Sequence, residues 1–384
     1  MLRMFQAALT EEVFLLGVKN YLNEMKLKSA TPEDLYEAMQ RAWDEINPQR
    51  PLDVAQMMRP WFDQPGIPLV TVSRTSSGLR LTQEEFGPSH TDIFNIPISY
   101  ATASTQNFDD TSAEFWLTTN EMEISREDLA KELGDNDWVI FNIRDTGYYV
   151  TNYDDELWRL IIGALVNDHE AIHFLNRGTL FADFQRFIQQ NIDISPTIFL
   201  EMVDSLKLEK HPHVWIRAER PLWTFEALTR GTDSHPLLLT FLQGIMTPIY
   251  GRTFDEERWP VEIVNRFSCL SGVQACLDNA LSVLHEVMET GSTSYPFSYR
   301  CNGFLAADEA TWMHFFDEAM ALDSSRRRFE KWGLECTQNK KLQEFFLDQA
   351  LNTSNNLSSF ERGDMFSALS SENHMGWETV IEFI

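Results

Sequence analysis

Over the first 66 residues, apolar side chains recur every three or four positions, the spacing of amphipathic helices. The first such run extends from Leu2 to Val18 with no capping residue before it. It therefore predicts a chain that opens inside a helix, as a piece of a longer protein would. A second helix is predicted to begin at Thr31, which is followed by a proline and two acidic residues. A short helix is expected at residues 52–62, before the turn sequence Gln-Pro-Gly at 64–66.

Between residues 68 and 153 the period shortens to two, which is typical of strands. Gly, Asp, Asn and Ser separate short β-branched or alternating segments in this region. Strands are predicted at residues 69–74, 79–83, 95–100, 114–117, 138–143 and 148–150. Half a dozen short strands within about 85 residues are typical of a small β-sandwich.

From residue 154 to the end the pattern is helical again. Helices are predicted at residues 156–166, 179–190, 236–250, 258–290 with a bend at Gly272, and 340–351. Consecutive helices with short connections favour antiparallel pairs stacked as an irregular solenoid of the HEAT or armadillo type. The fold class is therefore α+β and multidomain, with parts at residues 1–66, 67–153 and 154–384, the last of them still helical where the chain stops.

Charge excludes two classes of partner. Lys and Arg number 31 against 58 Asp and Glu, so the net charge is −27. Binding to nucleic acid or to an anionic membrane surface requires a basic footprint, and neither is expected. No stretch reaches the roughly 18 uncharged apolar residues of a membrane span; the nearest, residues 237–250, contains Gln243 and Gly244.

Four cysteines lie in the last third of the chain. Cys269 and Cys276 are seven positions apart, and Cys301 and Cys336 are 35 apart. On one straight helix the first pair would be roughly 10 Å apart, too far for a disulfide, but a bend at Gly272 would close the gap. Free buried thiols remain the alternative. Glycosylation sequons at Asn352 and Asn356 favour a secretory compartment. The support is slight, because such tripeptides also arise by chance.

Local strings along nearly the whole chain follow an order found in one family. They are LRMF at 2–5, EEVF at 11–14, GVKNYL at 17–22, MRPWFDQPGIP at 58–68, WVIFN at 138–142, TGYY at 146–149, NYD at 152–154 and LNR at 175–177. In this order they resemble the carboxy-terminal part of the aminopeptidase N family of zinc metallopeptidases. The strings match the end of the catalytic domain, the join into and exit from the β-sandwich, and the start of the helical cap. Two positions depart from the family: Val150 replaces an Arg, and Asp183 alone represents an Asp pair.

The resemblance implies a function and two bridges. It pairs Cys269 with Cys276 and Cys301 with Cys336 as disulfides. It implies a plasma-membrane or extracellular aminopeptidase that removes amino-terminal residues from peptides, with a cap domain that closes over the peptide cavity. It is also compatible with a homodimer formed through the cap domain. The family's zinc ligands and amine-binding loop lie upstream of the string that begins at Leu2. This chain is therefore expected to hold no zinc and to be inactive alone.

The sequence His169-Glu170-Ala171-Ile172-His173 fits the zinc motif H-E-x-x-H. The family's spacing would place a third ligand, a Glu, at position 192, where this chain has Ile. The preceding Asn-Asp pair also breaks a helix. We therefore interpret the motif as a decoy, a polar turn between two cap helices.

Two further histidine groups are weaker candidates. His285 lacks a second His four positions on, where Glu289 stands. The sequence His211-Pro212-His213 is expected to be a solvated loop, because proline breaks helices.

Three hypotheses result: a non-catalytic segment of an aminopeptidase N-like protein, a stand-alone module that binds peptides or proteins without cleaving them, and, weakest, a zinc peptidase that uses the decoy. Under the first hypothesis the opening segment lacks its packing partners. The apolar face of Leu2, Phe5, Leu9 and Val13 is then expected to be partly exposed.

Overall fold

The structure, a computed structural model, describes residues 1–86, 93–129, 133–134, 136–252, 258–291, 297–322, 333–370 and 376–383. The chain divides into two compact units, Met1–Glu209 and Lys210–Ile384. The first combines helices with small sheets, and the described part of the second is helical, so the chain is α+β and multidomain. The finer division at residues 66 and 153 stays a prediction.

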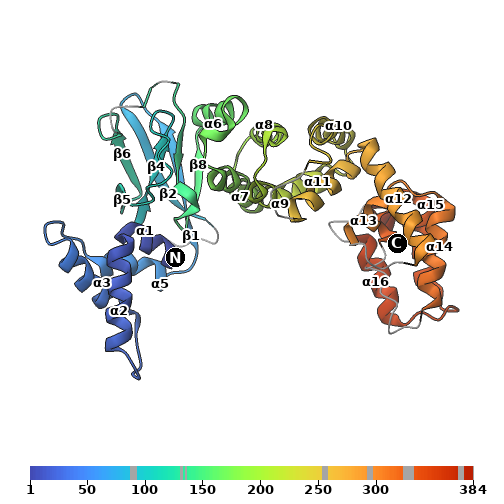
Figure 1. Cartoon of the computed structure of the whole chain (residues 1–384), viewed down its shortest axis with the longest axis horizontal. Coiled ribbons are helices and arrows are strands. Elements are labelled where there is room, and N and C mark those ends of the chain that lie inside the picture. Colours follow the sequence, from blue (N-terminus) through green and yellow to red (C-terminus); the bar gives the residue numbers. More distant parts are fainter. Residues whose placement is uncertain are drawn as a thin grey trace. The chain divides into compact units, whose positions relative to one another are not determined.

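Five helices open the chain and lie at one end of the strands (Figure 1). They are α1 (Leu2–Leu9), α2 (Glu11–Glu24), α3 (Pro32–Ile46), α4 (Val54–Met58) and α5 (Pro60–Asp63). The helical run that the sequence predicts from Leu2 is split at Thr10, whose φ of 72° lies outside the helical region. The predicted start of α3 carries a capping box, in which the Thr31 N–H donates to Asp34 Oδ2 at 2.7 Å.

Of the four residues on the predicted apolar face of the opening helices, three are buried, contrary to expectation, and one is exposed. Phe5, Leu9 and Val13 are each 0% exposed, whereas Leu2 is 54% exposed. Phe5 stacks against Phe62 of α5 with ring centroids 6.3 Å apart. For these three residues, the first unit itself therefore supplies the packing partners that were expected in a missing domain.

The strands form one four-stranded sheet and two pairs. Their bounds are β1 (Ile67–Arg74), β2 (Gly78–Phe86), β3 (Ile96–Ile98), β4 (Tyr100–Thr102), β5 (Phe115–Leu117), β6 (Glu121–Ser125), β7 (Val139–Phe141) and β8 (Val150–Tyr153). The larger sheet has the order β6-β2-β1-β8, and the pairs are β3-β5 and β4-β7. β1 pairs antiparallel with β2 but parallel with β8. β6 lies where the sequence predicts no strand, and the last strand begins at Val150 rather than two residues earlier.

Helices α6 (Asp155–Asn167), α7 (Phe174–Gln190) and α8 (Pro196–Ser205) complete the first unit. The carboxyl group of Asp154 joins α6 to the sheet. Asp154 Oδ1 accepts from the Leu157 N–H at 2.8 Å and caps α6, while Oδ2 accepts from the Arg74 N–H at 2.6 Å. The first turn of α6 is thereby fixed to the end of β1.

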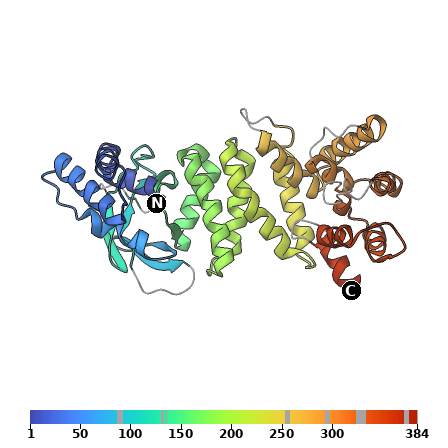
Figure 2. The ribbon, with the colours of Figure 1, turned by 90° about the horizontal axis from the view of Figure 1, so that it is seen from below.

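The described part of the second unit is built from helices (Figure 2, yellow to red). They are α9 (Pro212–Thr229), α10 (His235–Met246), α11 (Arg258–Leu270), α12 (Gln274–Thr290), α13 (Phe297–Phe304), α14 (Glu309–Ala321), α15 (Lys340–Leu351), α16 (Ser359–Ser370) and α17 (Trp377–Phe383). α11 contacts α9, α10, α12 and α13. A cluster of buried side chains surrounds Trp312, which is 0% exposed.

The predicted bend between α11 and α12 is present at Gly272, whose φ of +82° suits glycine. Two disulfides hold this unit: Cys269–Cys276, with Cα atoms 5.1 Å apart, and Cys301–Cys336, with Cα atoms 5.2 Å apart. Within the described ranges, no single helix is long and apolar enough to cross a membrane; one pair, Val261–Leu270 and Gln274–Thr290, bent by 105°, qualifies by length and composition only.

Candidate functional site

The H-E-x-x-H sequence does not lie on one helix. Residues His169–Ala171 form a 3₁₀ turn after α6, and His173 is the residue that caps α7. Two histidines four positions apart share a face only within a continuous α-helix, so this arrangement does not present them as a pair of zinc ligands.

Both imidazoles already have protein partners. His169 Nδ1 lies 3.0 Å from the Leu165 carbonyl oxygen, and its Nε2 lies 2.9 Å from Glu209 Oε2. His173 Nδ1 accepts from the Leu175 N–H at 3.2 Å. A zinc ligand needs a free nitrogen lone pair, and these contacts occupy both ring nitrogens of His169. The residues of this motif therefore do not fit a zinc ion.

The partner of His169 belongs to a buried charge cluster. The Glu209 side chain is 0% exposed and accepts from Arg177 Nε at 2.8 Å and from Arg177 Nη2 at 2.9 Å. Arg177 Nη1 donates to the Ile172 carbonyl at 2.6 Å. A bidentate pair with further hydrogen bonds to backbone carbonyls is a form in which charges tolerate burial. The cluster of His169, Arg177 and Glu209 thus fastens the turn between α6 and α7 to the end of the unit.

Two further α7 side chains fasten the helix to the β region. Asn176 Oδ1 accepts from the Arg144 N–H at 2.8 Å. Asp183, 2% exposed, accepts from the Thr151 N–H at 3.1 Å and from Arg186 Nη1 at 2.7 Å. Burial raises the pKa of Asp183 to about 7, although Arg186 opposes the shift. Asp183, which stands alone where the family has a pair of Asp residues, therefore joins α7 to β8.

The other histidine candidates do not gather into a site. His285 is exposed on α12. The predicted loop at His211-Pro212-His213 is wrong: Pro212 opens α9, and His211 Nδ1 accepts from the His213 N–H at 3.2 Å. Proline is favourable at the first helical position, where its missing N–H would be unpaired. Among the described residues, no three His, Cys, Asp or Glu side chains gather as a metal site requires.

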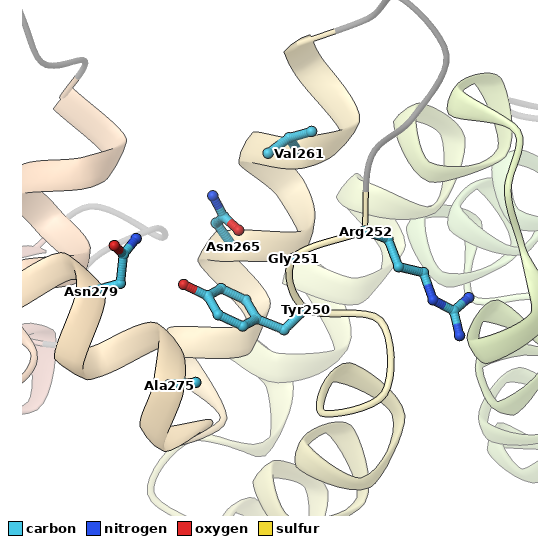
Figure 3. A pocket seen from close by; sticks show the side chains of 7 residues that line it. All are labelled: Tyr250, Gly251, Arg252, Val261, Asn265, Ala275 and Asn279. Carbon is cyan, nitrogen blue, oxygen red and sulfur yellow. The ribbon is translucent and has the colours of Figure 1, made fainter.

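A cavity of about 530 Å³ opens in the second unit between α11, α12 and the segment that follows α10 (Figure 3). Asn265 of α11 and Asn279 of α12 contribute to its walls, and Tyr250 extends its ring between them. Arg252 also lines the cavity, but its side chain turns away from the two asparagines. These residues were not predicted from the sequence, although two asparagines one helical turn from a cysteine pair are a usable signal.

A second cavity, of about 570 Å³, lies along α9 and α11. Arg266 sits there with its guanidinium 5.7 Å from the Trp223 ring centroid and 3.2 Å from Glu219 Oε1. A cation already shared between an aromatic face and a carboxylate is less available for a ligand.

The sites predicted for covalent modification are accessible. Asn352 and Asn356 are both exposed in the segment between α15 and α16. Asn352 Oδ1 accepts from the Ser354 N–H at 2.9 Å. The glycosylation itself stays a prediction.

Comparison with known proteins identifies the family. The family model of the ERAP1-like C-terminal domain matches residues 138–384, and that of the Peptidase family M1 domain matches residues 1–61. Aminopeptidase N of Plutella xylostella is 27% identical over 371 residues, which cover 91% of this chain and 39% of that protein.

Two other relatives agree. Human aminopeptidase N is 26% identical over 81% of this chain and 34% of its own length. The membrane alanyl aminopeptidase of Heliothis virescens is 30% identical over 56% of this chain and 22% of its own length. The chain thus spans less than two fifths of each of these relatives. By its two consecutive matches, the chain belongs to the M1 aminopeptidase family, of which it carries the carboxy-terminal portion.

Proposed function

We propose that this chain is the non-catalytic, carboxy-terminal part of a zinc aminopeptidase of the aminopeptidase N type, which removes amino-terminal residues from peptides. The observation that carries the proposal is the order of the two family matches, with the M1 domain at residues 1–61 before the ERAP1-like domain at 138–384. Zinc and the amine-binding loop would be supplied by sequence upstream of Leu2. The engagement of both His169 ring nitrogens supports a structural role for the decoy motif.

The proposed division of labour follows the three parts of the chain. Residues 1–66 complete a catalytic domain, residues 67–153 form a β-sandwich, and the helices from residue 154 onward form a HEAT- or armadillo-like solenoid that caps the peptide cavity. A homodimer through the cap and a location at the plasma membrane or outside the cell belong to the same proposal. The two disulfides and the exposed sequons support an oxidising compartment.

A chimera tests the proposal. The segment of the Plutella xylostella aminopeptidase N that this chain matches, 39% of that protein, is replaced by residues 1–384, and hydrolysis of alanyl-4-nitroanilide is measured. We expect the chimera to be active and a truncated relative that lacks the segment to be inactive. A chimera that is folded and loaded with zinc but inactive would contradict the proposal.

The chain alone provides the complementary measurement. We expect no stoichiometric zinc after dialysis and no hydrolysis of aminoacyl amides. One zinc per chain that is lost in His169→Ala would instead support the weakest hypothesis, a peptidase built on the decoy.

The stand-alone binding module remains the second candidate. The burial of Phe5, Leu9 and Val13 within the first unit favours it. Because the first unit already covers these side chains, they do not need a further domain to pack against. Limited proteolysis distinguishes the candidates: early cleavage before Pro68 favours an unsupported opening segment, and uniform resistance favours the module.

A further inference from the structure

The Cys269–Cys276 bridge fixes two helix faces against each other. α11 and α12 meet at a bend of 105°, and the bridge joins them across it. Residues three or four apart lie on one face of a helix. Asn265, four positions before Cys269, and Asn279, three positions after Cys276, therefore lie one turn out from the bridge on the facing sides of the bend. Asn265 and Asn279 line one cleft, each from its own helix.

The cavity of about 530 Å³ occupies this cleft. In Figure 3 the Tyr250 hydroxyl points toward Asn279, and the Asn265 carboxamide borders the same space. Ala275 and Gly251 also line the cleft and leave it open because they are small. Its volume lies within the roughly 300–1,000 Å³ of ligand pockets.

Both carboxamides are available to a ligand. Asn265 is half-buried and Asn279 is exposed. Across the part of the chain that the structure describes, neither side-chain amide has a hydrogen-bond partner. Each offers two N–H donors and a carbonyl acceptor. The walls therefore present paired donors and acceptors without a net charge, since Arg252 turns away.

We propose that this cleft binds a short, extended segment of peptide main chain, with Asn265 and Asn279 pairing to its amides and Tyr250 packing against one of its side chains. An extended chain directs its N–H and C=O groups alternately to its two edges, so a single strand satisfies polar groups on both walls. The proposal rests on the proposed function only for the point that this protein meets peptides. Recognition requires neither zinc nor hydrolysis.

Binding is tested on the full chain with a neutral hexapeptide of alternating Gly and Ala, acetylated at one end and amidated at the other. Blocked ends exclude capture by terminal charge. Affinity is measured by calorimetry, and side-chain NH₂ signals of ¹⁵N-asparagine are followed by NMR. We expect saturable binding that shifts two asparagine signals, which disappear individually in Asn265→Leu and Asn279→Leu.

Each of these substitutions is expected to weaken binding at least tenfold. The control Asn167→Leu, the same change at an exposed position of α6, should leave affinity unchanged. Ala275→Phe fills the cleft from an exposed position and should also block binding. This keeps the proposal testable if an asparagine variant does not fold.

Three results would overturn the proposal: no peptide binding, peptide binding that survives all three cleft substitutions, or binding of N,N′-diacetylchitobiose without binding of the peptide. The last outcome would assign the cleft to a sugar. None of them bears on the chimera, whose activity tests the proposed function separately.

Discussion

Replacing Asp183 by Asn removes a buried charge and little else. The Asp183 carboxyl is 2% exposed and accepts from the Thr151 N–H at 3.1 Å. An amide oxygen can accept the same hydrogen bond, and the side chains are nearly equal in size. The substitution also removes the ion pair with Arg186. That ion pair is weak, because the Arg186 side chain is partly exposed.

The expected effect depends on pH. Burial raises the pKa of Asp183 from 3.8 to about 7 in the folded state. A folded-state pKa above the unfolded value contributes stability that is fully present below about pH 4 and is lost as pH rises through about 7. Each pH unit within this window corresponds to about 1.4 kcal/mol. From pH 5 to pH 8, wild type should therefore lose about 2 to 3 kcal/mol of unfolding free energy relative to Asp183→Asn.

Urea unfolding followed by tryptophan fluorescence at pH 5, 6, 7 and 8 measures this difference for the transition of the Met1–Glu209 unit. Comparison with the variant cancels the titration of all other groups. The control is Asp193→Asn, which changes an exposed carboxyl in the next loop and should run parallel to wild type. If the Asp183→Asn and wild-type curves are also parallel, burial does not govern this carboxyl and the argument is refuted.

Further substitutions test the packing. Glu209→Ala leaves its partner guanidinium buried and unpaired, so urea unfolding should show a loss of about 3 to 5 kcal/mol; Glu209→Gln should lose less, and the reverse order would contradict the pairing. Replacing Cys301 and Cys336 together by Ser opens a loop of sequence separation 35 and should lower the unfolding free energy by about 3 to 4 kcal/mol. Gly303→Ala places a Cβ 2.5 Å from Leu284 Cγ and should lower the melting temperature. Gly363→Ala, with nothing within 4 Å, should raise it slightly.

Local signals in the sequence located several elements. The capping residues at Thr31 and the glycine at position 272 each act through neighbouring backbone groups, so their effect is visible in a short window. The break at Thr10 was missed because the apolar spacing continues through it, and only the backbone angle marks the end of α1. β6 was missed because acidic residues alternate with its apolar ones. It pairs with one neighbour at the edge of the sheet, where charged side chains face solvent.

The candidate sites were harder to predict because their members are distant in sequence. Glu209 meets Arg177 across 32 positions, and no spacing rule connects them. Tyr250, Asn265 and Asn279 line one cavity because of the way α11 and α12 pack together, which no short sequence window shows. The two asparagines could have been found from the cysteines, once the disulfide and the bend are combined with helical periodicity.

The parallel pairing of β1 with β8 has a consequence for synthesis on the ribosome. β1 and β2 are joined by a short turn, so their hairpin can form as soon as Phe86 has emerged. The other edge of β1 waits for β8, and the contact between Arg74 and Asp154 spans 80 residues. At about 5 to 20 residues per second, that edge stays unpaired for roughly 4 to 16 s. An open strand edge recruits other strands during this interval. Slower translation between residues 74 and 154 should therefore increase aggregation of the nascent chain without altering the stability of the finished protein.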